Sequence, residues 1–178
     1  MTQKILNAQA LKNIVRDIPD FPKAGIVFKD ISTILKDPIA LKSAVDLLAK
    51  KFKKAKITKV VAVESRGFIF GSVLAYKLGA GFILVRKKGK LPYKTRSVSY
   101  DLEYGTDTLE IHEDAVTSKD RVLIVDDLLA TGGTVEAVAK LLKDFNAKIV
   151  GSAFLIELSF LKGRERLKNL PIFAIITY

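Results

Sequence analysis

The sequence predicts an α/β domain whose strands form a parallel sheet. Short apolar runs rich in β-branched residues alternate along the chain with segments in which apolar residues recur at helical spacing. Two of these runs, 60–63 and 122–125, lead directly into a polar turn and then into a helical segment. Ligands bind at the carboxyl ends of parallel strands, so these turns are the first candidates for a functional site. No repeat, low-complexity tract or linker interrupts residues 1–178, which are expected to form a single domain.

Composition excludes several kinds of chemistry. The 178 residues are 49% hydrophobic, enough for a sizeable core, and include no cysteine and a single histidine. Disulfides, thiol catalysis and a histidine metal cluster are therefore excluded. We find no secretion signal and no apolar run of the roughly 18 residues that span a membrane, so we expect a cytoplasmic protein without a membrane partner.

The formal charge of +11 suits nucleic acid, acidic membranes and small polyanions alike, so its distribution matters. The lysines between 50 and 56 gather at the end of a predicted helix, where cations are favoured and stay solvated. The basic residues between 86 and 96 lie instead in a segment interrupted by glycine and proline, where no helix explains them. That second cluster is the functional candidate.

The first half of the chain begins with a predicted helix over residues 7–15, followed by a loop over 21–30 that either covers a ligand or simply packs on the core. Asp37 and Pro38 begin a helix that continues to Phe52. After the strand 60–63, a helix over 68–78 is expected to end at Gly79, and a further strand occupies 82–85.

The second half contains a long polar loop, 92–107, which the alternating strand 106–111 returns to the sheet as a half-buried edge, making a hairpin-like flap. His112 ends that strand as an ordinary polar residue. After the strand 122–125, a helix begins near residue 134. A strand over 148–158, a helical turn over 163–168 and a strand over 172–176 complete the chain.

The segment after Val125 carries the strongest chemical signal. Two adjacent acids, Asp126 and Asp127, end the strand, and the turn 131–134 reads Thr-Gly-Gly-Thr. Paired glycines let the backbone approach a phosphate, and the first N–H groups of the following helix point toward it. The carboxylates can accept hydrogen bonds from a sugar diol or hold a cation, so the segment suits a phosphorylated sugar. The simpler alternative is that a threonine only caps the helix.

Two further anion sites should converge on the same edge of the sheet. Ser65 and Arg66 form a polar turn after the first buried strand, and Arg86, Lys87 and Lys90 follow the next strand. Three anion sites suit a ligand with a phosphate at one end and a pyrophosphate at the other. Charge alone does not distinguish such a ligand from a nucleoside triphosphate, but the usual nucleotide-binding signatures are absent.

Residues 122–134 resemble the phosphoribosyl pyrophosphate (PRPP) binding motif of the type I phosphoribosyltransferases. Segments 21–31, 64–68, 86–92, 102–105 and 161–165 occur in the order and spacing of the adenine-specific members. The resemblance implies a three-layer parallel-sheet fold with an N-terminal hood, about 1–35, and a flexible catalytic flap, about 92–107. It also implies transfer of the 5-phosphoribosyl group from PRPP to adenine N9, giving AMP and pyrophosphate, with Mg²⁺ carried on PRPP, no nucleic-acid partner, and a homodimer.

The resemblance also assigns residue roles. The 5-phosphate and ribose would be bound by Asp126, Asp127, Ala130, Thr131, Gly132, Gly133 and Thr134, and the pyrophosphate by Ser65, Arg66, Arg86, Lys87 and Lys90. Adenine would contact Val27, Phe28, Lys29 and Leu128, where Lys29 replaces an arginine that is frequent in the family. Glu103, Tyr104 and Arg66 would be catalytic, and no residue would bind metal directly.

Three alternatives stay open at this stage. Glu103 either transfers a proton or only shapes the flap. A xanthine-type or other purine phosphoribosyltransferase would share the PRPP motif and differ in the hood. A non-catalytic PRPP sensor that binds nucleic acid through its basic surface is the alternative from another functional class.

Overall fold

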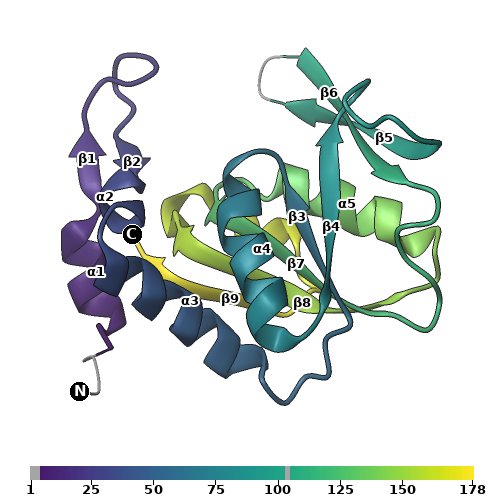
Figure 1. Ribbon diagram of the computed structural model, residues 1–178. Helices are drawn as coiled ribbons and strands as arrows, with labels where there is room; N and C mark the ends of the chain where they lie inside the picture. The colour runs from purple at the N-terminus through teal and green to yellow at the C-terminus, as the bar shows by residue number, and fades with distance from the viewer. Residues whose placement is uncertain (1–4, 103–104) are drawn as a thin grey trace.

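The computed structural model describes residues 5–102 and 105–178. Its main feature is a seven-stranded sheet in the order β5-β6-β4-β3-β7-β8-β9 (Figure 1). The strands are β3 (Lys59–Val63), β4 (Gly81–Lys87), β5 (Thr95–Leu102), β6 (Gly105–His112), β7 (Arg121–Leu129), β8 (Lys148–Glu157) and β9 (Ile172–Thr177). The five strands from β4 to β9 run parallel, while β5 and β6 form an antiparallel hairpin beside β4. This arrangement confirms the predicted α/β class.

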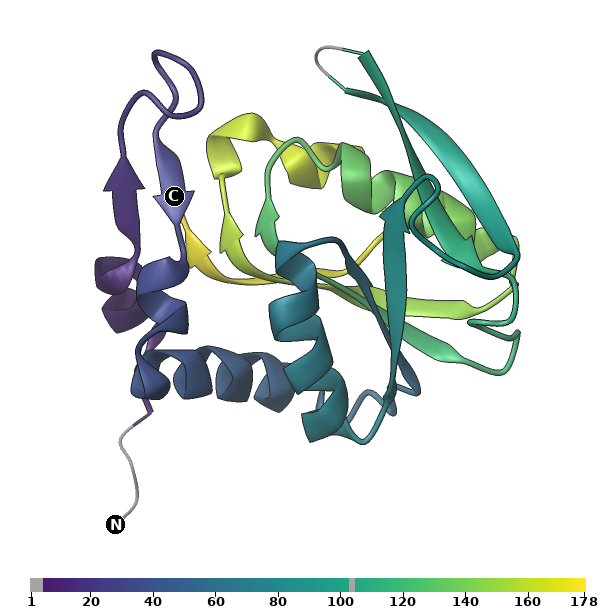
Figure 2. The same cartoon turned by 45° about the horizontal axis from the view of Figure 1, so that its top comes forward.

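Helices cover both faces of the sheet, as Figure 2 shows. Helices α3 (Pro38–Phe52) and α4 (Arg66–Leu78) lie on one face and α5 (Gly133–Lys143) on the other. Alternate residues of β7 serve the two cores: Leu123 belongs to the cluster that contains α3 and α4, and Ile124 to the cluster that contains α5. Because side chains of a strand alternate between faces, a continuous apolar run such as 122–125 fits a strand buried on both sides.

The N-terminal segment forms a small unit of its own against one end of the sheet (Figure 1). It comprises α1 (Ala8–Ile14), β1 (Arg16–Ile18), β2 (Phe28–Asp30) and α2 (Ser32–Leu35). Strands β1 and β2 pair antiparallel, so the predicted loop 21–30 ends in a strand, and α2 is a helix that no sequence pattern predicted. We refer to residues 5–35 as the hood.

The prediction of a polar loop over residues 92–107 is wrong. Half of this segment is strand β5, which forms the sheet edge, while β6 lies inside the sheet between β5 and β4. Val98 and Tyr100 pack against the core that contains α5, and Arg96 stacks on Phe145 of the same region with its Cζ 4.6 Å from the ring centroid. The apolar residues alternate with serines, a strand pattern that the polar composition obscured.

Three other boundaries also differ from the predictions. Strand β4 continues through Arg86 and Lys87 because these residues pair with Glu110 and Leu109 of β6, so they are not in a loop. Strand β7 continues through both acids to Leu129 because β8 runs alongside it. Helix α4 begins at Arg66 rather than at Phe68. In the part of the chain that the structure describes, no helix has the length and hydrophobicity to cross a membrane.

Candidate active site

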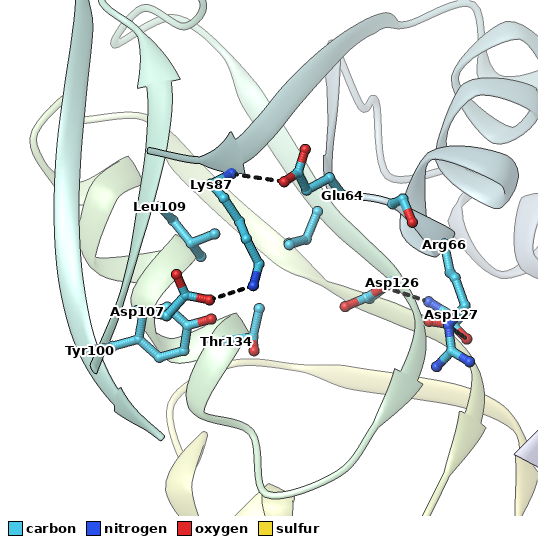
Figure 3. A pocket seen from close by; sticks show the side chains of 11 residues that line it. Glu64, Arg66, Lys87, Tyr100, Asp107, Leu109, Asp126, Asp127 and Thr134 are labelled. Atoms are coloured by element: carbon cyan, nitrogen blue, oxygen red, sulfur yellow. Dashed lines mark hydrogen bonds and ion pairs between the residues drawn. The ribbon is translucent and has the colours of Figure 1, made fainter. Parts of the chain in front are cut away.

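A polar cavity of about 460 Å³ opens at the carboxyl ends of β3, β4 and β7, beside the hairpin. Figure 3 shows the side chains that point into it. They are Val63, Glu64, Ser65, Arg66, Lys87, Tyr100, Asp107, Leu109, Asp126, Asp127 and Thr134. The cavity therefore brings together residues from all three anion sites expected from the sequence.

The two adjacent acids lie at the centre of this site. Asp127 is 3% exposed, and its Oδ2 atom lies 3.0 Å from Arg66 Nε in an ion pair that lacks the alignment of a hydrogen bond. Burial raises the pKa of both carboxyls, and the neighbouring charge of Asp127 raises the pKa of Asp126 further. The positive charge of Arg66 acts to lower the pKa of both carboxyls.

Gly67 explains how α4 comes so close to these acids. A Cβ atom at this position would lie 2.9 Å from Asp126 Oδ1 and 3.0 Å from the carbonyl oxygen of Val125. Any larger residue would push the first turn of α4 away from β7, and Arg66 with it. The glycine therefore sets the distance between the guanidinium and Asp127.

The Thr-Gly-Gly-Thr turn encloses a second, smaller hollow of about 70 Å³ that it shares with Asp126 and Leu128. Gly132 has φ +85°, a left-handed conformation that favours glycine, and α5 begins at the next residue. Free N–H groups at a helix start attract phosphate oxygens. The hollow thus has the shape and polarity expected of a phosphate site.

Gly163 supports this turn from behind, a role that its motif alone did not reveal. A Cβ atom at Gly163 would lie 2.3 Å from the carbonyl oxygen of Ala130, and one at Gly132 would lie 2.9 Å from the carbonyl oxygen of Gly163. The next residue, Arg164, binds the buried carboxylate of Glu157 with both Nε and Nη2, at 2.7 and 2.6 Å. This bidentate pair fixes the short helix α6 (Gly163–Arg166) against the turn.

The basic segment divides into two groups. Lys87 lines the cavity, and its Nζ atom lies 2.9 Å from Oδ2 of Asp107 on the neighbouring strand β6 (Figure 3). This contact raises the pKa of Lys87 and lowers that of Asp107. Arg86 and Lys90 are instead paired with Glu64. Glu64 and Asp107 were not identified from the sequence, because their partners come from other strands.

The hood brings Phe28 to the edge of the site. The Phe28 ring centroid lies 5.2 Å from Arg66 Cζ and 5.2 Å from the Phe21 ring centroid. Val27 is exposed, whereas the Lys29 ammonium is 2.7 Å from Asp17 Oδ1 and 4.0 Å from the centroid of the Tyr178 ring. The Lys29 side chain is thus engaged within the hood and with the C-terminus.

Leu128, the other expected wall of an adenine pocket, is half-buried against the core that contains α3 and α4. Glu103 and Tyr104 lie outside the described residues. Among the residues that the structure does describe, no group of three or more His, Cys, Asp or Glu side chains could hold a metal ion. The donors nearest to a bound sugar would be the two carboxylates of Asp126 and Asp127, which suit a cation brought by the ligand.

Comparison with known proteins decides the family. The sequence profile of the phosphoribosyl transferase domain matches residues 30–171. Adenine phosphoribosyltransferase of Syntrophotalea carbinolica is 60% identical over 168 residues, which cover 94% of this chain and 98% of that protein. The chain belongs to the adenine phosphoribosyltransferase family.

Solved adenine phosphoribosyltransferases have the same fold. The crystal structure of the enzyme from Thermoanaerobacter pseudethanolicus matches with a TM-score of 0.94 at 50% identity, covering 97% of this chain and 100% of that one. The Saccharomyces cerevisiae enzyme, solved with an imino-altritol bisphosphate and adenine, matches with a TM-score of 0.89 at 41% identity, covering 94% and 97% of the two chains. The three-layer phosphoribosyltransferase fold implied by the resemblance is therefore confirmed.

The raised pKa values of the acid pair predict that Asp126→Asn stabilises the unliganded protein. The penalty for burying the charge is absent below the ordinary carboxyl pKa of 3.8, grows as the pH rises, and is complete above the folded-state pKa. The asparagine Oδ1 can still accept the 2.9 Å hydrogen bond from the Asp127 amide. We expect the free energy of unfolding at pH 7 to rise by about 0.5–2 kcal/mol, with the gain shrinking toward pH 4.

Urea unfolding of the wild type and the variant at several pH values measures this effect. Asp114→Asn, at an exposed position, is the matched control and should change little at any pH. A loss of stability at pH 7, or a gain that does not depend on pH, would contradict the prediction.

Proposed function

We propose that this protein transfers the 5-phosphoribosyl group of PRPP to adenine N9, releasing pyrophosphate and forming AMP for purine salvage. The observation that carries the proposal is a cavity in which the acid pair and the Thr-Gly-Gly-Thr turn face Arg66 and Lys87, in a chain that is 60% identical to an adenine phosphoribosyltransferase. The yeast relative that was solved with adenine supports the choice of base.

PRPP would span the cavity between its two anion sites. The 5-phosphate would occupy the hollow formed by residues 130–134, and the ribose hydroxyls would donate to Asp126 and Asp127. At the other end, Ser65, Arg66 and Lys87 would bind the pyrophosphate, and the resemblance adds Arg86 and Lys90 of the same basic segment. Ser65, Arg66 and Lys87 support this placement because all three line the cavity.

Adenine would lie between Phe28 and Leu128, with the backbone of Val27 and Lys29 facing its polar edge. The Phe28 ring contacts Arg66, which supports placing adenine beside the end of the cavity proposed for the pyrophosphate. Glu103 and Tyr104 would cover the reacting atoms. Glu103 could also accept a proton from the base.

The chemistry follows from charge and from exclusion of water. As pyrophosphate leaves, the anomeric carbon gains oxocarbenium character, and the cations of Arg66 and Lys87 stabilise the negative charge on the leaving group. Mg²⁺, arriving as part of the PRPP substrate, would neutralise further charge on the pyrophosphate. No covalent intermediate with the protein is needed, and the hairpin over the site would keep water from the sugar cation.

Assays of pyrophosphate release from PRPP with adenine, guanine, hypoxanthine and xanthine test the function. We expect turnover with adenine and little with the other bases. Turnover of another purine in place of adenine would favour the xanthine-type alternative. Salt-sensitive nucleic-acid binding without turnover of any base would favour the non-catalytic regulator.

Arg66→Ala should lower kcat by about 10²- to 10³-fold, because it removes a cation that stabilises the leaving group. The KM for adenine should change far less. Steady-state kinetics with both substrates measures the difference, and Arg66→Lys, which keeps the charge, should retain more activity. An unchanged kcat for Arg66→Ala would remove Arg66 from the catalytic groups.

We also propose a homodimer that uses the outer face of α4. Ile69, Val73 and Tyr76 recur at helical spacing on this face and are 37%, 43% and 89% exposed. Beside them lies an apolar groove of about 440 Å³ between α3 and α4, lined in part by Leu41 and Val45. Contiguous exposed apolar surface of this kind is typical of protein interfaces.

Val73→Glu should therefore shift the protein from dimer to monomer, because it places a charge in the proposed interface. Sedimentation equilibrium over a range of concentrations measures the shift. Lys143→Glu, on α5 across the sheet, is the control and should leave the assembly unchanged. A wild-type protein that is monomeric at all concentrations would overturn this interface.

A cytoplasmic location and a single domain over residues 1–178 remain predictions from the sequence.

A further inference from the structure

Glu64 is the most heavily engaged carboxylate at the rim of the cavity, although the proposed reaction gives it no role. Its side chain is 6% exposed and ends in three contacts. Arg86 Nε lies 2.7 Å from Oε2, Lys90 Nζ lies 2.8 Å from Oε1, and the Lys87 amide donates to Oε1 at 3.2 Å. One carboxylate therefore holds three of the five residues between 86 and 90.

The turn after β4 is fixed by further polar contacts. Arg86 Nη1 donates to the carbonyl oxygen of Lys90 at 3.0 Å, and the Lys88 amide donates to the carbonyl oxygen of Thr108 at 3.1 Å. The Gly89 amide donates at 2.9 Å to Oε2 of the buried Glu110. With the turn held in this way, Lys87 is the only residue of the segment whose side chain is among those lining the described cavity.

The charge state of Glu64 fits this role. Burial acts to raise its pKa, but the contacts with Lys90, Arg86 and the Lys87 amide outweigh burial and lower the pKa, so the group stays ionised. An ionised carboxylate at the rim of a pyrophosphate site would repel the ligand if it were bare. Glu64, Arg86 and Lys90 together carry a net charge of +1. Because both cations lie against the carboxylate, most of their positive potential is cancelled by Glu64.

We infer that Glu64 is a positioning residue for pyrophosphate binding, and that Arg86 and Lys90 act through it rather than on the ligand. Glu64 fixes the 86–90 turn so that the Lys87 ammonium meets the pyrophosphate, and Asp107 holds that ammonium until the ligand arrives. This assignment rests on the proposed function and divides the basic segment into one ligand-binding lysine and two supporting cations.

A double-mutant cycle of Glu64→Gln and Lys90→Met tests the inference. Glu64→Gln should raise the KM for PRPP about tenfold or more, the loss expected when contacts to a charged group are removed. The KM for adenine should stay within about twofold, which separates misplacement of Lys87 from general unfolding. Glu113→Gln, which changes an exposed carboxylate directly after β6, is the control.

The second arm decides whether Lys90 touches the ligand. If Lys90 acts through Glu64, Lys90→Met raises the KM for PRPP in the wild-type background and adds less than about twofold in the Glu64→Gln background. If Lys90 binds pyrophosphate directly, the two effects multiply and the inference is overturned. An unchanged KM for PRPP in Glu64→Gln would overturn it as well.

Failure of the proposed function is distinguishable from failure of this inference. If the wild type does not convert PRPP and adenine, the proposed function fails, and calorimetric titration of the same variants with magnesium pyrophosphate replaces the kinetic assay. Weaker pyrophosphate binding in Glu64→Gln, with no further loss on adding Lys90→Met, supports the positioning role. Equal and additive losses from both changes refute it.

Discussion

The buried carboxylate of Asp127 constrains how three parts of the chain meet. It lies within β7, and Arg66 of α4 is the cation at its side. Arg66 reaches it because Gly67 lets the start of α4 approach β7, and the same guanidinium contacts Phe28 of the hood. One ion pair therefore links an interior strand of the sheet, a covering helix and the N-terminal hood, and an uncompensated charge would cost several kcal/mol if the pair were broken.

Carboxylates are paired with cations in the rest of the site as well. Within the described residues, the cavity and its rim carry four carboxylates, Glu64, Asp107, Asp126 and Asp127, and four cations, Arg66, Arg86, Lys87 and Lys90. The protein's charge of +11 is thus not concentrated in the site as free positive charge. A polyanionic ligand must take cations from their carboxylates, and the carboxylates left behind need donors or a cation of their own. The sugar diol and the divalent ion of the proposed substrate would supply both.

Much of this fold was predictable because its signals are local. The apolar run 122–125, the acids after it and the glycine turn are contiguous, so the strand, the turn and the following helix were predictable, and the turn encloses a hollow beside Asp126. The phosphate site in this hollow stays a prediction. The extension of β4 through Lys87 was not predictable in the same way, since it depends on pairing with β6 after an excursion of some twenty residues. Glu64, Asp107 and Gly163 were missed for the same reason, because what each contacts is set by tertiary packing and not by its neighbours in sequence.

The two acids at the centre of the site lower the stability of the free protein and at the same time favour binding of a ligand that satisfies them. Asp126 and Asp127 both carry raised pKa values, which means that the folded protein pays to keep them ionised at neutral pH. The hydroxyl donors of the proposed ribose would relieve that penalty, so part of the binding free energy would come from correcting an unfavourable arrangement in the free protein. Lys87 shows the opposite balance, since its contact with Asp107 favours its charged form before any ligand arrives. At the proposed sugar end of the cavity, a ligand would relieve an unfavourable arrangement, whereas at the proposed pyrophosphate end it would first have to break the contact between Lys87 and Asp107.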